Sequence, residues 1–480
     1  MKKLLFLFLV ILLSLALFAC GDVEQTGDTV TTEDVTTSTV VTTEPPTFPL
    51  THDILPELSY LGRVFTAYNA GPGLVSDQNG TTDEDSYVKV IPSTTAEKLL
   101  AYTKILEENG YRSVATTEVD GDVYYTYEKY GKLFYFYYNQ KLGETRVIVD
   151  NSSVELSKIV PQYTPKAEDT VAFYQYSLNY RYADKEGFDP VVYTESVSQD
   201  SGMSYVLKLA DNSVVVIDGG GSKQSTVKSR QGFLDFLRSI TETPEGEKVR
   251  IATWIFTHAH GDHMVFANEF LREQYQQIEL LGMAYNFPSY QVLGSGYAGT
   301  VFEIKGTLEE RYPDVLYHKL HTGEVLDMAG ITIEVVYTHE DAINRLGVSK
   351  IGDFNSTSTV MKITIGGKSI MILGDIGGAA QEVIVAMHSA EYLKCDAVQA
   401  SHHGFNSLNT LYPLINAPIA LFPQSAFCLK DPENSRGNLK EYQEVMTYSS
   451  EEYFAHKYTY EFTVQNGEFV IRALPRYDAQ

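Results

Sequence analysis

Cysteine is scarce in this chain. The sequence of 480 residues contains three cysteines, and only Cys395 and Cys428 remain if the chain is cleaved before Cys20, as argued below. Two cysteines cannot build a disulfide framework or a cysteine-based zinc knuckle. One bridge between Cys395 and Cys428 would suit an oxidising exterior, but we expect two buried free thiols. Any bound metal must therefore rest on histidine and aspartate.

Basic residues are also few. The chain has 37 lysines and arginines against 62 acidic residues, a formal net charge of −25. Lys2 and Lys3 are the only charged residues among residues 1–19, so loss of that segment would leave −27. Proteins that bind DNA or RNA gain most of their affinity by neutralising phosphates. The acidic charge thus argues against long nucleic acid as a substrate.

A long apolar run is missing except at the N-terminus. The run from Leu4 to Phe18 follows Lys2-Lys3, and it is too short for a comfortable transmembrane span. It ends in Leu17-Phe-Ala-Cys20-Gly21, the pattern of a bacterial lipoprotein signal peptide cut before Cys20. We expect residues 1–19 to be removed and Cys20 to be acylated, which anchors the protein to the membrane on its extracytoplasmic side. The alternative is an ordinary secretory signal that happens to end in cysteine.

The segment after Cys20 is polar and threonine-rich. Residues 21–50 hold ten threonines and six acidic residues but no lysine or arginine. Such a composition buries too little apolar surface to offset the chain entropy of folding. We therefore predict a disordered linker over residues 20–50.

The few histidines are concentrated where metal chemistry would need them. Residues 257–263 read Thr-His-Ala-His-Gly-Asp-His and follow an apolar strand-like run, residues 251–256. In an extended segment, side chains two positions apart point the same way, so His258 and His260 can bind one ion. A turn at Gly261 would direct Asp262 and His263 to a second ion. With only 11 histidines in the chain, a chance polar loop is a poor explanation.

Further ligands stand at the ends of later predicted strands. Residues 359–365 and 368–373 read as a hairpin with a two-glycine turn, and that hairpin leads to Asp375. Residues 396–400, Asp-Ala-Val-Gln-Ala, lead into Ser401-His-His-Gly404. A carboxylate that bridges two cations, with one more imidazole, would complete a two-metal centre. We expect two divalent ions, zinc first, with manganese or iron as alternatives because His and Asp serve all three.

These segments, in this order, resemble the metallo-β-lactamase superfamily over residues 203–475. Residues 355–358, 372–375 and 400–404 are similar to the nuclease-like domain of the bacterial competence protein and to the secreted phosphorylcholine esterases, which hydrolyse phosphodiesters. The resemblance implies an α/β fold, an αββα sandwich. Patterning agrees: we predict a hairpin at 204–209 and 213–217, helices at 226–241, 264–278 and within 305–312, and strands at 250–257 and 279–285.

The resemblance also assigns roles. It favours His403 as a metal ligand and leaves His402 to contact a substrate oxyanion or to protonate the leaving group. Asn355 stands where many relatives have a metal-binding histidine, and His339 is the rival for that place. We expect His318, His321 and His339 each to be a solvated loop histidine. Asp218 is expected either to support the metal ligands from behind or to be an ordinary turn residue.

A second module precedes the hydrolase, which we place at residues 171–480. Residues 51–170 are long enough for a small α+β domain. Thr94 and Glu97 have the spacing of a capping box before a helix that Gly110 ends, and strands are predicted at 122–129, 132–139 and 145–150. These strands are rich in tyrosine and phenylalanine. Such a face could stack on sugar rings or choline-like cations, or it could be an ordinary sheet surface.

The sequence therefore predicts a lipid-anchored dinuclear metallohydrolase. The zinc β-lactamases have a cysteine where Asp375 stands, and the iron oxygen reductases have a glutamate in place of the second histidine of residues 257–263. Neither residue is present here. The remaining chemistry is hydrolysis by a metal-bound hydroxide that Asp262 or Asp375 orients. We expect a phosphodiester substrate, in a small molecule or a cell-envelope polymer. A lactone, thioester or β-lactam hydrolase is the alternative enzyme, and a non-catalytic surface binding lipoprotein is the alternative outside enzymes.

Overall fold

A computed structural model describes most of the chain beyond residue 54. The described residues are 55–62, 87–150, 153–164, 166, 169–178, 202–288, 290–343, 354–430, 439–456 and 458–477. All of them fall in one unit, Pro49–Gln480. The predicted signal peptide, Cys20 and the linker up to residue 50 lie outside the described residues. Within the described part, no helix combines the length and the hydropathy needed to cross a membrane.

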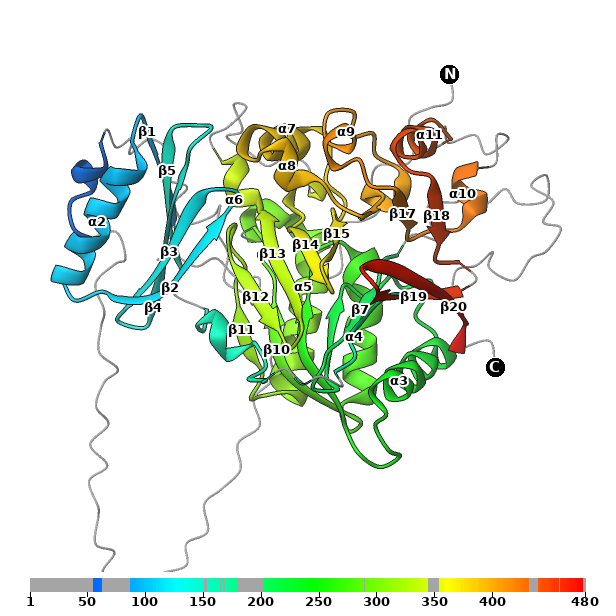
Figure 1. Cartoon of the computed structure of the whole chain (residues 1–480). Helices are drawn as coiled ribbons and strands as arrows, with labels where there is room; N and C mark the ends of the chain where they lie inside the picture. The colour runs from blue at the N-terminus through cyan, green and yellow to red at the C-terminus, as the bar shows by residue number, and fades with distance from the viewer. Residues whose placement is uncertain are drawn as a thin grey trace, which may run out of the picture. The chain divides into compact units, whose positions relative to one another are not determined.

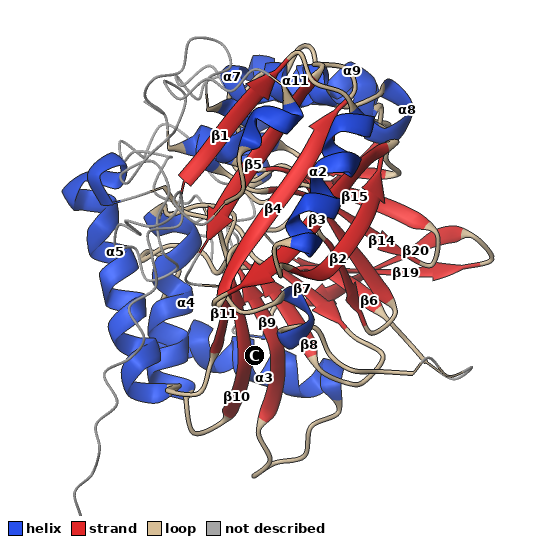
Figure 2. Cartoon of the chain, turned by 90° about the vertical axis from the view of Figure 1, so that its left-hand side faces the viewer, coloured by secondary structure: helices blue, strands red, loops and turns tan. Residues whose placement is uncertain are grey.

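The N-terminal module is an antiparallel sheet with one helix on it (Figure 2). Helix α2, Ala96–Glu108, packs Leu99, Tyr102 and Leu106 against Phe134 and Val147 of the sheet. The strands lie in the order β1 (Tyr87–Pro92), β5 (Glu144–Asp150), β4 (Lys132–Asn139), β3 (Asp122–Lys129) and β2 (Arg112–Val119). The predicted helix and the three predicted strands are thereby confirmed. Strands β1 and β2 were not predicted, and β2 is mostly exposed, which removes the apolar alternation that reveals a strand.

The start of α2 differs from the predicted capping box. Thr95, not Thr94, is the N-cap, and its side chain accepts a hydrogen bond from the Lys98 N–H at 3.3 Å. Thr94 is buried, and its N–H donates to the carbonyl of Gly143. The loop between β4 and β5 therefore holds Thr94, and the next residue caps the helix.

Two larger sheets lie face to face in the rest of the described chain (Figure 1). Ile217 and Ile255 of one sheet and Ile372 and Leu421 of the other belong to the core between them. The first sheet runs β11 (Leu316–His318), β10 (Ile278–Ala284), β9 (Val249–Ile255), β8 (Val214–Ile217), β7 (Tyr205–Lys208), β6 (Ala172–Gln175), β19 (Tyr458–Gln465) and β20 (Glu468–Pro475). The second runs β12 (Val325–Met328), β13 (Ile331–Tyr337), β14 (Val360–Ile365), β15 (Lys368–Ile372), β16 (Ala397–Gln399), β17 (Ile419–Phe422) and β18 (Glu451–Phe454).

Helices cover the outer face of each large sheet. Phe233, Phe270 and Ile304 come from three helices and share a core cluster with Trp254 of the first sheet. These helices are α3 (Val227–Thr241), α4 (Gly261–Gln274) and α5 (Tyr290–Arg311). The second sheet is covered by α7 (Gly378–Met387), α8 (Ala390–Leu393), α9 (Tyr412–Ile415), α10 (Ala426–Lys430) and α11 (Leu439–Tyr448). The order helix, sheet, sheet, helix confirms the predicted αββα sandwich behind a small α+β module.

Helix α5 is longer than the sequence suggested. Only a piece within residues 305–312 was predicted, because Gly294, Gly296, Gly299 and Gly306 each disfavour a helix by about 1 kcal/mol relative to alanine. Val301, Ile304 and Leu308 are buried against the sheet. Burial of this apolar stripe outweighs the low intrinsic propensity.

The small module contacts the second sheet's side of the sandwich. Arg146 of β5 is fully buried, and its guanidinium donates to the carbonyls of Glu340 at 2.6 Å and Ile343 at 2.9 Å. Glu340 belongs to the short helix α6, His339–Ala342. Asn139 donates to the carbonyl of Met387 at 3.1 Å. Ile159 belongs to the core between the two large sheets. The chain therefore packs against the sandwich, and no longer against the small module's sheet, before residue 170.

Candidate metal centre

The predicted ligands follow three strands that end at one edge of the sandwich. His258, His260, Asp262 and His263 follow β9, and the last two lie in the first turn of α4. Asp375 follows β15 and His403 follows β16. Strand β9 is parallel to β8 and β10, and β15, β16 and β17 are parallel to one another. Their carboxyl ends therefore bring distant loops together.

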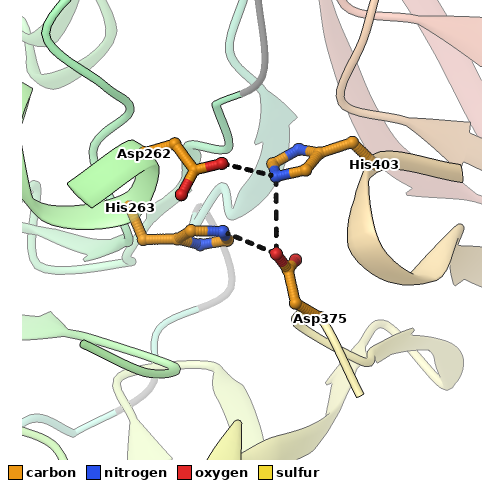
Figure 3. Close-up of side chains that lie close together, drawn as sticks. All are labelled: Asp262, His263, Asp375 and His403. Atoms are coloured by element: carbon orange, nitrogen blue, oxygen red, sulfur yellow. Dashed lines mark hydrogen bonds and ion pairs between the residues drawn. The ribbon is translucent and has the colours of Figure 1, made fainter. Parts of the chain in front are cut away.

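Asp375 lies at the centre of this cluster (Figure 3). Its Oδ2 is 3.2 Å from Nε2 of His263, 3.6 Å from Nε2 of His403 and 3.8 Å from Nε2 of His258. Oδ2 of Asp262 lies 3.3 Å from Nε2 of His403. Two sets of ligand atoms result, each within 4.8 Å: Asp262, His263, Asp375 and His403, and then His258, His260 and Asp375. One carboxylate is common to both sets.

Hydrogen bonds behind the ligands fix which nitrogen of each ring faces the centre. Asp218 accepts from Nδ1 of His263 at 2.8 Å, from the Thr257 N–H at 2.8 Å and from the Thr257 hydroxyl at 2.8 Å. Because the hydroxyl proton is given to Asp218, Oγ1 of Thr257 accepts from Nδ1 of His258 at 3.1 Å. Both rings therefore direct Nε2 toward Asp375.

The pair His402 and His403 is held in the same way. Nδ1 of His403 donates to the carbonyl of Pro423 at 3.3 Å. The Asn406 amide donates to the carbonyls of Asp375 and Ile376, which leaves its Oδ1 to accept from Nδ1 of His402 at 3.2 Å. The Nε2 of His402 lies 3.8 Å from Oδ2 of Asp375, and its side chain is 31% exposed. His402 thus faces the centre from its open side, whereas His403 is buried.

The backbone is strained where these ligands are placed. His402 and His403 have φ of 51° and 58°, the left-handed region, in two successive residues that are not glycine. This conformation costs roughly 1–2 kcal/mol per residue. Gly374, at φ +56°, precedes Asp375, and a Cβ there would lie 2.8 Å from the side chain of Ser358. The close packing around Asp375 therefore requires an unfavourable backbone conformation.

Charges in the cluster shift its pKa values strongly. Burial lowers the pKa of His263, but attraction by Asp375 and Asp218 outweighs burial and raises the pKa well above its usual value. Burial likewise opposes protonation of His403, yet Asp375 and Asp262 raise its pKa to about 9. The same contacts hold the pKa of Asp375 far below the ordinary range, against the effect of burial. The site stabilises deprotonated carboxylates beside positive charge.

His258 and His260 behave differently. Burial, helped by the charge on His263, lowers the pKa of both rings, so they are neutral near pH 7. A neutral imidazole with a free Nε2 is the form that binds a metal ion.

The donor set fits divalent cations. Nε2 of His258 and Oδ1 of Asp375 are buried and find no hydrogen-bond partner among the described residues. Buried polar atoms are rarely left without a partner, so such atoms in a cluster of imidazoles and carboxylates are the expected ligands of an ion. Asp262, His263, Asp375 and His403 would hold one ion. His258, His260 and Asp375 would hold the other.

The remaining predicted site residues lie outside these two sets. Asn355 begins a short turn of 3-10 helix, η6 (Asn355–Thr357), directly after Phe354, whose ring centroid is 6.2 Å from that of His260. His339 begins α6 and is not grouped with the ligand atoms in the described part of the chain. Asp218 occupies the supporting place that was predicted as one of its two alternatives.

The prediction of solvated loop histidines is wrong for all three. His318, His321 and His339 are each no more than 1% exposed. Nε2 of His318 contacts Glu324 at 3.0 Å, and Nδ1 of His321 contacts Glu340 at 2.7 Å. Buried carboxylates pair with these rings, and this pairing permits their burial.

Sequence reasoning missed two supporting residues. Asn406 positions His402, and the hydroxyl of Ser358 accepts the Asp375 N–H at 3.0 Å. The position of Asn406, four residues after His402 and beyond Gly404, gave a weak signal at best. The free thiols were predicted correctly, because Cys395 and Cys428 are both buried and unbridged.

An αββα sandwich with an Asp- and His-lined centre at the carboxyl ends of its strands defines the class of metal-dependent hydrolase folds. Residues 197–404 match the family model of the metallo-beta-lactamase superfamily. This part of the chain is therefore similar to the metallo-beta-lactamase superfamily. The match ends at Gly404, directly after the last ligand.

Solved structures similar to this chain include three of known source. The metallo-beta-lactamase fold protein YhfI of Bacillus subtilis is 10% identical, with a TM-score of 0.32, and the match covers 63% of this chain and 100% of that one. The human short-form tRNase Z is 9% identical, with a TM-score of 0.26 and coverage of 63% and 99%. Zn2+-bound PqqB of Methylobacterium extorquens is 12% identical, with a TM-score of 0.28 and coverage of 47% and 71%. No curated protein matches the chain.

Proposed function

We propose that this protein is a dinuclear metal-dependent hydrolase that cleaves a phosphodiester. The observation that carries the proposal is the shared carboxylate of Asp375, which belongs to both sets of ligand atoms. One carboxylate common to two sets is what a pair of adjacent ions requires. We propose zinc as the native metal, with manganese or iron as alternatives.

Charge favours an anionic substrate. Two divalent ions would carry four positive charges, and the carboxylates of Asp262 and Asp375 carry two negative charges. The centre would stay positive even when the carboxylate of Asp218 is counted as well. When bound, the ions would lower the pKa of a coordinated water from near 16 toward about 7 and neutralise charge that develops on a phosphate oxygen. A phosphodiester brings the negative charge that this excess attracts.

The chain's own groups would orient the reactants and move protons. Asp262 is about one-third exposed and stands in the first turn of α4, with its carboxylate toward Nε2 of His403. It can accept a hydrogen bond from the attacking water and hold that water in line. His402 reaches the same centre from the open side, with Nδ1 anchored on Asn406. Its Nε2 can therefore protonate the leaving oxygen or bind the oxyanion.

We further propose that the protein works outside the cytoplasmic membrane. The lipoprotein pattern around Cys20 and the polar linker after it support a lipid anchor with reach. Teichoic-acid-like polymers and small nucleotides both offer phosphodiesters in that place. The net charge of −25 disfavours long nucleic acid.

The test uses the mature chain, expressed from residue 20 with Cys20 replaced by serine and loaded with zinc or manganese. Metal analysis should give close to two equivalents, and bis-p-nitrophenyl phosphate should be cleaved. Asp262→Ala should abolish this cleavage while the protein stays folded, and Asp235→Ala, an exposed carboxylate on α3, should leave it unchanged.

Other substrates separate the alternatives. Turnover of nitrocefin or aryl esters, without diester cleavage, would replace the phosphodiesterase by a β-lactam or ester hydrolase. Metal binding with no turnover of any of these would favour a binding lipoprotein. Cleavage of plasmid DNA at low salt would favour a nuclease, despite the acidic charge of the chain.

A further inference from the structure

A cavity lies between the small module and the sandwich. Its volume is about 270 Å3, room for about nine water molecules at the ~30 Å3 that each occupies in the liquid. One wall is the face of the five-stranded sheet formed by β2, β3 and β4, and the other includes the segment 322–327 that leads into β12. None of the metal-centre residues lines it. The cavity is thus a separate place, just below the usual size of small-molecule pockets.

Tyrosine forms much of its wall. Tyr124, Tyr125, Tyr135 and Tyr137 all line the cavity. The rings of Tyr124 and Tyr137 are stacked, with centroids 5.0 Å apart and an interplanar angle of 30°. Gly323 makes this packing possible, because a Cβ there would lie 2.0 Å from the Tyr124 ring. The sheet and segment 322–327 therefore meet tightly around the aromatic wall, which defines its shape.

Three of the hydroxyls that line the cavity already form hydrogen bonds within the protein. Thr117 donates to the carbonyl of Gly323 at 2.6 Å. Thr322 and Tyr137 both donate to the buried carboxylate of Asp341. A neutral sugar needs several free donors and acceptors that converge on it. Thr117, Thr322 and Tyr137 do not offer theirs to a ligand.

Tyr135 differs from these three residues. Its side chain lines the cavity, the residue is 5% exposed, and its hydroxyl has no hydrogen-bond partner among the described residues. The ring rests on His321, with centroids 3.9 Å apart. Burial, and then the charges of Glu324, Asp150 and Glu340, raise the pKa of this phenol well above its ordinary value. A buried phenol without a partner indicates that a ligand or water completes it.

The charged side chains that line the cavity are acidic. Glu324 and Asp327 line the cavity, whereas no lysine, arginine or histidine does so among the described residues. His318 contacts both carboxylate oxygens of Glu324 at 3.0 Å from behind, and the His321 N–H donates to one of them at 2.8 Å. Glu324 is therefore held in place beside the tyrosine rings.

We propose that this cavity binds a small organic ammonium cation. Aromatic faces attract a cation through the negative face of the ring, and a methylated ammonium needs no hydrogen bonds from the wall. The carboxylates add attraction, and the acidic chain as a whole concentrates cations around it. The phenol of Tyr135 can bond one polar substituent, such as a hydroxyl. This combination fits an alkylammonium better than a sugar.

Calorimetric titration of the metal-loaded mature chain tests the proposal. The probe is (2-hydroxyethyl)trimethylammonium, compared with its neutral carbon isostere 3,3-dimethylbutan-1-ol, and with glucose. Cation–π attraction and the carboxylates should make the cation bind at least about tenfold more tightly than the isostere. Equal binding of the two, or no saturable binding of the cation, overturns the proposal. Saturable binding of glucose alone also overturns it and assigns the cavity to sugars.

Two variants locate the site. Ala115 lines the cavity at an exposed position of β2, so Ala115→Trp should obstruct the cavity without disturbing the core and weaken binding by about tenfold or more. Tyr135→Phe should weaken the hydroxylated cation severalfold but leave tetramethylammonium unchanged, because that ion has no hydroxyl. Tyr130→Phe, an exposed tyrosine that does not line the cavity, is the control. Binding that both test variants leave unchanged places the ligand elsewhere and refutes the assignment.

Discussion

Nδ1 of His263 lies 2.8 Å from Oδ2 of Asp218, and both side chains are fully buried. Asp218 is not in either set of ligand atoms, yet this contact determines which nitrogen of His263 faces Asp375. The Thr257 bonds to the same carboxylate transmit the effect to His258. Asp218 is therefore a positioning residue for two ligands at once.

Asp218→Asn should weaken metal binding while the fold is kept. Asparagine tolerates the left-handed backbone of this position, at φ 56°, but its amide cannot accept from all three donors. Loss of such a supporting contact typically costs about 10–100-fold in metal affinity. Competition with a chromogenic chelator measures the change, and Asp235→Asn serves as the exposed control. Unchanged affinity in the Asp218 variant would show that the rings are oriented by other contacts.

The shared carboxylate predicts unequal metal contents for two alanine variants. Asp375→Ala removes a ligand from both sets, so it should weaken both sites and bring the bound metal below one equivalent at micromolar free metal, whereas Asp262→Ala spares the set of His258, His260 and Asp375. About one equivalent should then remain in the Asp262 variant. Metal analysis after gel filtration gives the answer. Equal contents in the two variants would contradict a shared ligand.

His402 should affect turnover without affecting metal content. It contacts the centre from its exposed side and is absent from both sets of ligand atoms. Loss of a general acid typically lowers kcat by about 10²–10⁴-fold. The loss in His402→Ala should be large for an alkyl phosphodiester and small for bis-p-nitrophenyl phosphate, since p-nitrophenolate leaves without a proton. Equal losses on both substrates would point to oxyanion binding in place of proton donation.

A buried histidine outside both sets of ligand atoms should make stability depend on pH. Burial opposes the protonation of His321, but attraction by Glu340 and hydrogen bonds with Asp150 and Glu340 raise its pKa to about 10. The unfolded chain has a histidine pKa of about 6.5, so the folded state holds this proton more tightly. The resulting stabilisation is complete below about pH 6.5 and is lost as the pH rises toward 10.

Thermal unfolding of the metal-loaded protein at pH 6.5 and 9.5 measures this effect. Tm of the parent protein should be lower at pH 9.5 than at pH 6.5. This decrease in Tm should be smaller in His321→Gln, because that variant is destabilised chiefly at the lower pH. Lys394→Gln, in an exposed ion pair with Glu391, should keep the parent's pH dependence. A His321 variant with the same dependence as the parent would show that the ring is neutral when folded.

Cys20 should decide where the protein is found. In a bacterial host that acylates lipoproteins, the parent chain is expected in the membrane fraction and Cys20→Ala outside it or uncleaved. Labelling with a clickable palmitate analogue tests acylation directly. Membrane retention of an unlabelled Cys20→Ala chain would mean that something other than a lipid holds it.

Much of the centre could be predicted because its residues stand at strand ends. The spacing in residues 257–263 and the apolar runs before Asp375 and His403 are local signals, and the structure brings these side chains together. Several strands of the two large sheets could also be predicted from the sequence. Their buried strands are short apolar runs, as in residues 214–217 and 370–373.

The rest depends on contacts between distant parts of the chain. Nothing local to His321 reveals that Glu340 and Asp150 pair with it. The exposed strand β2 has no apolar alternation to reveal it. His402 and His403 point in different directions because both residues have a left-handed backbone. The residue types alone do not predict this backbone conformation. Long-range packing overrides local propensity at each of these places.

The left-handed backbone of His402 and His403, after β16, also implies that thermal stability and activity oppose each other at this place. Glycine adopts this geometry freely, so His402→Gly should melt at a higher temperature than His402→Ala and show the same loss of turnover on an alkyl phosphodiester. An engineer who selects only for heat resistance would tend to remove the imidazole. The strained backbone at His402 and His403 therefore lowers stability and in return places an imidazole on the open side of the candidate metal centre.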